Sequence, residues 1–282
     1  MKSDCHMHMV LDGVDWKAAI GRHASAVDMD FVRRTVKLYA QQGYTYLRDG
    51  GDRWGVGAAA REVAKEYSIC YRTPLAPLCC KGHYGSFIGL TYENLREYAQ
   101  LVIQQRQQGA DFIKIMISGL MDFNRFGVLT EEGLPPAQIR ELIHIAHEEG
   151  FRVMAHANGA RTMEAAAVAG VDSVEHGAYP DTDALAAMVE NGTVWVPTLS
   201  TVGNLRGKGR FEEDAVRQIL DLALQNVGRF AAMGGLLAAG SDAGAWSVTH
   251  AMDSEWALLN QAIGPDAETI VNAGNNRIRQ LF

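Results

Sequence analysis

Short apolar runs alternate with amphipathic stretches along the chain. The runs are rich in Val, Ile, Leu and Ala and are bounded by turn residues, which is typical of strands buried on both faces. Between them, apolar residues recur every three to four positions, the spacing of a helix face. The predicted strands are Ser3–His8, Thr45–Arg48, Thr73–Leu78, Phe112–Ile117, Arg152–Ala155, Ser173–Glu175, Thr193–Pro197 and Leu236–Ala239.

Helical patterns lie between these strands, and four are clear: Met29–Gln42, Tyr92–Gln107, Pro136–Glu149 and Glu213–Met233. Helix Pro136–Glu149 starts with a proline and is followed by Gly150, which are the usual start and stop signals of a helix. Strand-then-helix units repeated along one chain predict parallel strands joined by crossover helices.

Eight such units fit an α/β fold of the (β/α)8 TIM-barrel type, which we expect as a single domain over residues 1–282. A doubly wound open sheet is the competing architecture. It is disfavoured because no Gly-x-Gly-x-x-Gly motif follows the first predicted strand.

The net charge, the cysteines and the lengths of the apolar runs limit which partners and which cellular compartment we expect. The net charge of −7 argues against a surface for nucleic acid or acidic membranes. The four cysteines form no Cys-x-x-Cys pair, so we predict reduced, partly buried thiols. We expect a cytoplasmic protein, because no signal peptide is visible and the apolar runs are too short to span a bilayer.

The first predicted strand ends in His6-Met7-His8. Side chains alternate along a strand, so the two imidazoles project from the same side and are able to bind one metal ion. Four more residues with suitable side chains lie in or directly after later predicted strands: Lys114, His156, His176 and Asp242.

The barrel hypothesis brings these residues together, because active sites lie where the carboxyl ends of the strands converge. Lys114 stands among aliphatic residues, where a lysine is costly unless it has a role. Four imidazoles and a carboxylate suit Zn²⁺, with Mn²⁺, Fe²⁺, Co²⁺ or Ni²⁺ as alternatives.

This order of motifs resembles the amidohydrolase superfamily of metal-dependent hydrolases, and within it the imidazolonepropionase- and prolidase-like members. The resemblance extends over essentially the whole chain. Relatives also carry a small flanking β-sandwich, which we expect to be absent here. The motifs are His6-Met7-His8, Ile113-Lys114-Ile115-Met116, Ala155-His156-Ala157, Glu175-His176-Gly177 and Gly240-Ser241-Asp242-Ala243.

The resemblance implies two divalent metal ions, bridged by a Lys114 that carbon dioxide has carboxylated on N6. It also implies hydrolysis of an amide-type C–N bond in a dipeptide, an N-acyl amino acid or a cyclic amide. The resemblance further implies that a hydroxide held between the metals attacks the carbonyl and that Asp242 shuttles the proton. The implied metal ligands are His6, His8, Lys114, His156, His176 and Asp242.

Several alternatives remain. One is a mononuclear deaminase- or imidazolonepropionase-type hydrolase in which His176 is catalytic and orients the substrate. A second is a lactonase or phosphotriesterase with the same ligands. A third is a non-enzymatic scaffold. A deoxyribonuclease of the TatD type is disfavoured, because a glutamate is usual at the position of Lys114 and the chain is acidic.

The small-molecule substrate is expected to meet four further side chains that follow predicted strands: His83, Tyr179, Arg206 and His250. His83 matches a position that contacts the substrate carbonyl in prolidase-like relatives. Arg206 lies in a basic, glycine-containing loop suited to a substrate carboxylate. We also expect a homo-oligomer.

Overall fold

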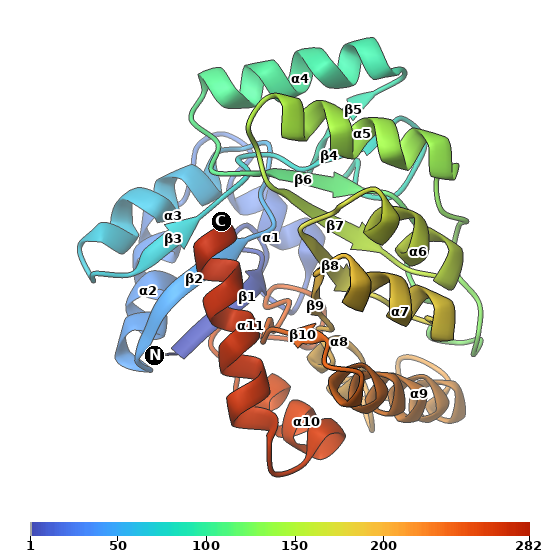
Figure 1. Cartoon of the computed structure of the whole chain (residues 1–282). Coiled ribbons are helices and arrows are strands. Elements are labelled where there is room, and N and C mark those ends of the chain that lie inside the picture. Colours follow the sequence, from blue (N-terminus) through green and yellow to red (C-terminus); the bar gives the residue numbers. More distant parts are fainter. Residues whose placement is uncertain (1) are drawn as a thin grey trace.

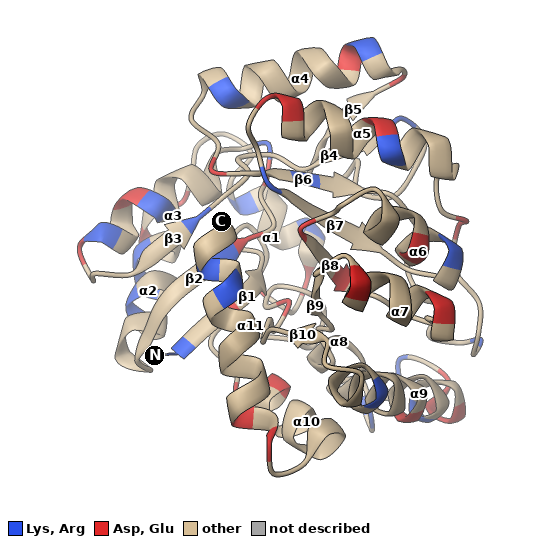
Figure 2. Ribbon diagram, viewed as in Figure 1, with Lys and Arg blue, Asp and Glu red and all other residues tan. Residues whose placement is uncertain are grey.

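Neighbouring strands in the structure are parallel in every pair, as expected when a helix returns the chain between consecutive strands. The structure is a computed structural model that describes residues 2–282. Strands occupy the middle of the molecule and helices surround them (Figure 1). Charged residues gather on these outer helices, with both signs interspersed (Figure 2). The mixed α/β class with parallel strands is therefore confirmed.

The strands are short and the helices longer. The strands are β1 (Lys2–Met7), β2 (Tyr44–Asp49), β3 (Cys70–Arg72), β4 (Leu78–Cys80), β5 (Leu90–Tyr92), β6 (Ile113–Met116), β7 (Val153–Ala157), β8 (Ser173–His176), β9 (Val194–Val196) and β10 (Leu236–Leu237). The helices are α1 (Trp16–Arg22), α2 (Met29–Gln41), α3 (Val56–Lys65), α4 (Leu95–Gln107), α5 (Pro136–Glu148), α6 (Ala160–Val168), α7 (Thr182–Glu190), α8 (Ser200–Gly203), α9 (Glu213–Ala232), α10 (Ser254–Ile263) and α11 (Ala267–Leu281).

The closed barrel is not confirmed, because the strands form two sheets. One has the order β1-β2-β3, and the other has the order β10-β9-β8-β7-β6-β4-β5. The predicted strand Thr73–Leu78 is wrong, since most of it lies between β3 and β4. Pro74 and Pro77 lack the backbone N–H that a ladder needs. The other predicted strands and the four predicted helices match observed elements to within a few residues at their ends.

Backbone hydrogen bonds link the two sheets at two places. The Cys5 N–H donates to the Ala239 carbonyl at 2.8 Å, which joins β1 to the segment after β10. The Asp111 N–H donates to the Thr73 carbonyl at 3.0 Å, which joins the residue after β3 to the segment before β6.

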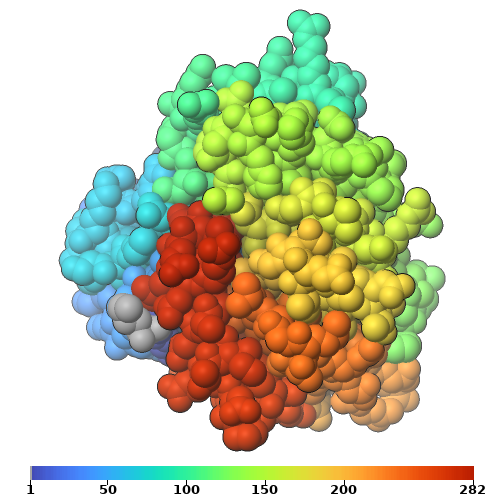
Figure 3. Space-filling view, viewed as in Figure 1, coloured from blue at the N-terminus to red at the C-terminus, as the bar shows by residue number. Residues whose placement is uncertain are grey.

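A buried apolar cluster fills the space between the sheets, with side chains from strands of both and from α11. Among them are Cys5 of β1, Tyr46 of β2, Met154 of β7 and Ile278 of α11. Helix α11 lies across one face of the molecule, between its early and late segments (Figure 3). The sheets therefore share a core although they share no ladder.

The structure shows the state of the cysteines and the character of the helices in residues 2–282. All four cysteines are free, with Cys5 and Cys79 buried and Cys70 exposed. Within residues 2–282, no helix combines the length and the apolar character that a bilayer crossing requires.

Gly274 lets α11 approach β10 closely. A Cβ atom at this position would lie 1.9 Å from the backbone oxygen of Leu237. Alanine normally stabilises a helix interior relative to glycine, but here it would push α11 away from the sheet.

We therefore expect Gly274→Ala to lower the free energy of unfolding by about 1–3 kcal/mol, because of overpacking. Gly21 of α1 is the matched control, since a Cβ there meets nothing within 4 Å. Gly21→Ala should raise stability by about 0.5–1 kcal/mol. Urea denaturation followed by circular dichroism measures both changes. Equal effects of the two variants would contradict the close approach.

Candidate metal centre

The structure gathers the six expected metal ligands around the base of one cavity. Parallel strands place their carboxyl ends on the same side, which brings together residues far apart in the sequence. In chain order they are His6 of β1, His8 directly after it, Lys114 of β6, His156 of β7, His176 at the end of β8 and Asp242 after β10.

The tightest group contains His6, His8 and Asp242, which each offer a donor atom within 4.8 Å of the others. The Nε2 atoms of the two histidines are 3.3 Å apart. Asp242 Oδ1 lies 3.5 Å from His6 Nε2 and 3.2 Å from His8 Nε2. Three donors this close, and buried, form an arrangement that a divalent cation would stabilise.

His176 and His156 continue the site on the next strands. Their ring centroids are 4.6 Å apart, and that of His176 is 5.0 Å from that of His6. His176 Nδ1 lies 2.7 Å from the Thr198 hydroxyl and 3.9 Å from Asp242 Oδ2. His156 Nε2 hydrogen-bonds the Gly119 carbonyl at 3.1 Å, which leaves Nδ1 for another partner.

Asp242 is positioned by the close approach of its segment to β1. The Asp242 N–H donates to the His6 carbonyl at 2.7 Å. A Cβ at Gly240 would lie 2.8 Å from the backbone nitrogen of His6, so the approach requires glycine there. Buried Asp4 accepts hydrogen bonds from the Ser241 N–H and hydroxyl. Asp242 itself has φ of 55°, a conformation that non-glycine residues rarely adopt and that recurs at functional sites.

His6 is held from behind by a carboxylate. Glu175 Oε2 lies 2.7 Å from His6 Nδ1, and Glu175 Oε1 accepts a 2.8 Å bond from the Arg48 guanidinium. The Ser173 hydroxyl donates to the same oxygen at 2.6 Å. An ionised carboxylate accepts hydrogen bonds and cannot donate them. Glu175 therefore fixes the proton of His6 on Nδ1 and leaves the lone pair of His6 Nε2 facing the cluster.

Lys114 is buried, and its Nζ has no hydrogen-bond partner in residues 2–282. Burial lowers the lysine pKa to about 8, against the opposing charges of Glu175 and Asp242. The neutral amine is therefore far more populated near neutral pH than in an ordinary lysine.

Three of the histidines, His6, His156 and His176, are held neutral. Burial, followed by the charge of Lys114, lowers the pKa of His156 to about 3 and that of His6 well below its usual range. Burial and neighbouring imidazoles do the same for His176. Neutral imidazole is the form that ligates metals.

The donor set fits a divalent metal. Three of its buried polar atoms, His8 Nδ1, Lys114 Nζ and Asp242 Oδ1, make no hydrogen bond in the described chain. Buried polar atoms normally find partners, and nitrogen and carboxylate donors around a shared space are what zinc-like cations require.

Above this base the cavity has a volume of about 610 Å³ and largely apolar walls. This volume suits a small organic molecule. The aromatic side chains that line it are Trp16, Tyr84, Phe87, Phe123, Phe211 and Trp246.

The four side chains expected to meet the substrate do not line this cavity. His83 is half-buried and faces Glu131, with its Nδ1 3.5 Å from Glu131 Oε2. Arg206 is exposed in its loop. Nε2 of the half-buried His250 lies 2.9 Å from the Leu11 carbonyl oxygen.

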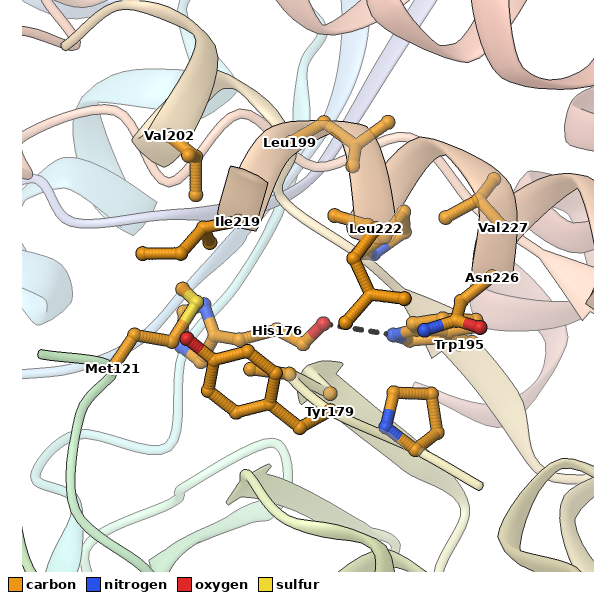
Figure 4. Close-up of a pocket in the computed structure, with 15 residues that line it drawn as sticks. Met121, His176, Tyr179, Trp195, Leu199, Val202, Ile219, Leu222, Asn226 and Val227 are labelled. Atoms are coloured by element: carbon orange, nitrogen blue, oxygen red, sulfur yellow. Dashed lines mark hydrogen bonds between the residues drawn. The ribbon is translucent and has the colours of Figure 1, made fainter. Parts of the chain in front are cut away.

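Tyr179 lines a smaller pocket that borders His176 from another side (Figure 4). There the Trp195 indole N–H donates to the His176 carbonyl at 2.9 Å, as the figure shows. The volume of this pocket is about 20 Å³, which is too small for a substrate.

Three residues of the site have no role that the sequence predicts. Glu175 stands in one of the motifs, but only the fold brings it into contact with His6. Tyr84 and Arg210 line the cavity in place of their neighbours His83 and Arg206. Tyr84 packs its ring 4.8 Å from that of His156. The loop and its basic character were visible in the sequence, but not which residue faces inward.

No family model matches the chain. An uncharacterised protein of Mycobacterium tuberculosis is 33% identical over 142 residues, which cover 48% of this chain and 38% of that protein. The ochratoxinase of Aspergillus niger is 25% identical over 240 residues, which cover 71% of this chain and 47% of that protein. The chain thus matches less than half the length of these curated relatives.

Solved structures align over nearly the whole chain. A Xaa-Pro dipeptidase with bound methionine aligns with a TM-score of 0.76 and 21% identity, over 98% of this chain and 74% of that one. The A. niger ochratoxinase aligns with a TM-score of 0.79 and 21% identity, over 98% of this chain and 70% of that one. An amidohydrolase aligns with a TM-score of 0.75 and 22% identity, over 99% of this chain and 74% of that one. The chain therefore shares its fold with these proteins, and in fold the expected resemblance to amidohydrolases is confirmed.

Proposed function

We propose that this protein is a metal-dependent hydrolase that cleaves an amide-type C–N bond in a dipeptide, an N-acyl amino acid or a cyclic amide. The cluster of His6, His8 and Asp242 at the base of a substrate-sized cavity carries the proposal. It is supported by the activities named for similar proteins, a Xaa-Pro dipeptidase and an ochratoxinase.

We also propose that the two sheets act together as one (β/α)8 barrel in a single domain. The hydrogen bonds between β1 and the segment after β10, and the shared apolar cluster, support this arrangement. Its mouth is the edge at which the ligands meet.

The metal, which we propose to be zinc, would be held by His6, His8 and Asp242, with His156 and His176 available to a second ion. A divalent metal bound there supplies a Lewis acid, which polarises the scissile carbonyl and lowers the pKa of water.

Asp242 is the proton carrier of the proposed reaction. Water attacks the carbonyl carbon, a C–O bond forms, and the C–N bond breaks. The carboxylate accepts the proton that the water loses and delivers it to the leaving nitrogen. Its Oδ1 is buried, faces the cluster and makes no hydrogen bond, so it is positioned to accept that proton.

We expect Asp242→Asn to lower kcat by about 100-fold or more, since the amide cannot carry the proton. Asp266 of the exposed surface, whose side chain caps no backbone group, is the matched control for the same change. Steady-state kinetics on a panel of N-acyl amino acids, at equal metal content, measures the effect. Unchanged turnover in Asp242→Asn would disprove the proton-transfer role.

Lys114 decides between a binuclear and a mononuclear site. We propose that its neutral amine adds to carbon dioxide and loses a proton, and that the resulting carbamate would help to hold two metals. Burial, the lowered pKa and the unpaired Nζ support this. The mononuclear alternative, a deaminase-type site, is favoured by the fact that only His6, His8 and Asp242 form a tight donor group among the described residues.

Intact mass under native conditions in bicarbonate, with metal analysis, distinguishes the two. We expect a mass gain of one carbon dioxide and near two metals per chain, and loss of both the adduct and one metal in Lys114→Met. Methionine has similar length and no amine. One metal per chain, with no adduct and no effect of Lys114→Met on metal content, would establish the mononuclear site.

Glu175 positions His6, so Glu175→Gln should weaken zinc affinity by about 10–100-fold. Competition with a chelating dye measures the affinity, and circular dichroism checks that the variant is folded. Ser173→Ala is the control, because it removes one donor to Glu175 and leaves the carboxylate against His6. Zinc affinity equal to that of the unmodified chain would mean that His6 needs no such partner.

A further inference from the structure

We propose that Arg210 binds a carboxylate of the substrate, so that the substrate is an amide that carries a free carboxylate beside a large apolar or aromatic group. This inference rests on the proposed hydrolase function and deepens it. Arg210 lies in the loop between α8 and α9 and lines the same cavity as the ligand cluster.

The Arg210 guanidinium is held by aromatic rings alone. Its central carbon lies 4.3 Å from the centroid of Trp246 and 5.4 Å from that of Phe211. Within residues 2–282 it makes no hydrogen bond and no ion pair. Stacking on a ring face leaves the N–H donors at the edge of the guanidinium plane available.

A carboxylate is the group that such an edge recognises. The planar fork of an arginine donates two parallel N–H bonds to the two oxygens of a carboxylate, and a fixed plane reduces the entropy lost on binding. Phosphate shares this chemistry, but the amide substrates proposed above supply a carboxylate next to the scissile bond.

The loop is anchored, which fixes the position of Arg210. Glu213, the nearest acidic side chain along the helix, accepts the Gly207 and Gly209 N–H groups. The Glu212 N–H donates to Asn124 Oδ1 at 3.2 Å. The Asn204 side chain donates to the Ser247 carbonyl at 3.1 Å.

The other charges that line the cavity are already engaged. Lys114 and Asp242 belong to the ligand cluster at the base. The Asp15 side chain caps α1 by accepting the Lys17 and Ala18 N–H groups. Among the described residues that line the cavity, Arg210 is therefore the charged side chain that has no polar partner, and the aromatic side chains around it favour an apolar group on the ligand.

Binding to metal-free protein tests the subsite independently of catalysis. The probes are N-acetyl-L-phenylalanine and N-acetyl-L-phenylalaninamide, which differ only in the carboxylate, titrated by calorimetry after dialysis against a chelator. We expect the carboxylate probe to bind more tightly, and Arg210→Met to weaken its binding about 10–100-fold without changing that of the carboxamide.

Lys208→Met is the matched control, because Lys208 carries the same charge on the same loop and is exposed, as Arg210 is, but does not line the cavity. It should leave both affinities unchanged. Arg210→Lys keeps the charge but not the fork, so its affinity for the carboxylate should lie between those of Arg210→Met and the unmodified chain. Equal binding of the carboxylate probe by Arg210→Met and Lys208→Met, with both folded by circular dichroism, would overturn the proposal.

Kinetics separates this inference from the proposed function. If the metal-loaded enzyme hydrolyses N-acyl amino acids, Arg210→Met should raise KM for them and leave kcat largely unchanged. If no amide is hydrolysed but the binding difference persists, the proposed function fails and the carboxylate subsite stands. If amides are hydrolysed and Arg210→Met alters neither KM nor binding, the function stands and the subsite fails.

Discussion

The buried ion pair between Arg48 and Glu175 spans the interior from one sheet to the other. Arg48 belongs to β2 and Glu175 to β8, both are fully buried, and their atoms are 2.8 Å apart. Removing one partner of such a pair leaves a buried charge and costs about 3–5 kcal/mol. The guanidinium also packs 4.5 Å from the ring centroid of Phe282 and donates to the Cys5 carbonyl. Since Glu175 also fixes the proton of His6, the ion pair that joins the sheets also orients the imidazole of His6.

The residues of the candidate metal centre were predictable because their signals in the sequence are local. A buried strand reads as an apolar run, and a polar residue at its carboxyl end stands out. Lys114 was conspicuous as one charge among aliphatic residues. The region of Pro74 and Pro77 misled the prediction, since its apolar residues resemble a strand while its prolines interrupt the ladder. Strand β5 was missed, because its three residues carry almost no pattern.

The residues around the ligands were less predictable because their roles depend on distant partners. Arg48 and Glu175 are 127 positions apart, and no local pattern announces their contact. His83 and Tyr84 are neighbours, and backbone direction alone decides which of them faces the cavity. Arg210 differs from Arg206 in its contact with Trp246, which follows a later strand. Such preferences arise from packing between loops, which the sequence does not encode at short range.

An exchange of loops between this chain and proteins of the same fold would meet a restriction at the rim of the cavity. Residues 119–131 and 204–212 come from different strand-helix units but are fastened by the Glu212–Asn124 hydrogen bond and by the packing of Phe123 on Phe211, with ring centroids 5.2 Å apart. If either segment alone were exchanged, Phe123 or Phe211 would lose the ring on which it packs, and the hydrogen bond between the Glu212 N–H and Asn124 would be lost. The two loops therefore form one exchangeable unit, and directed evolution of specificity should diversify them together.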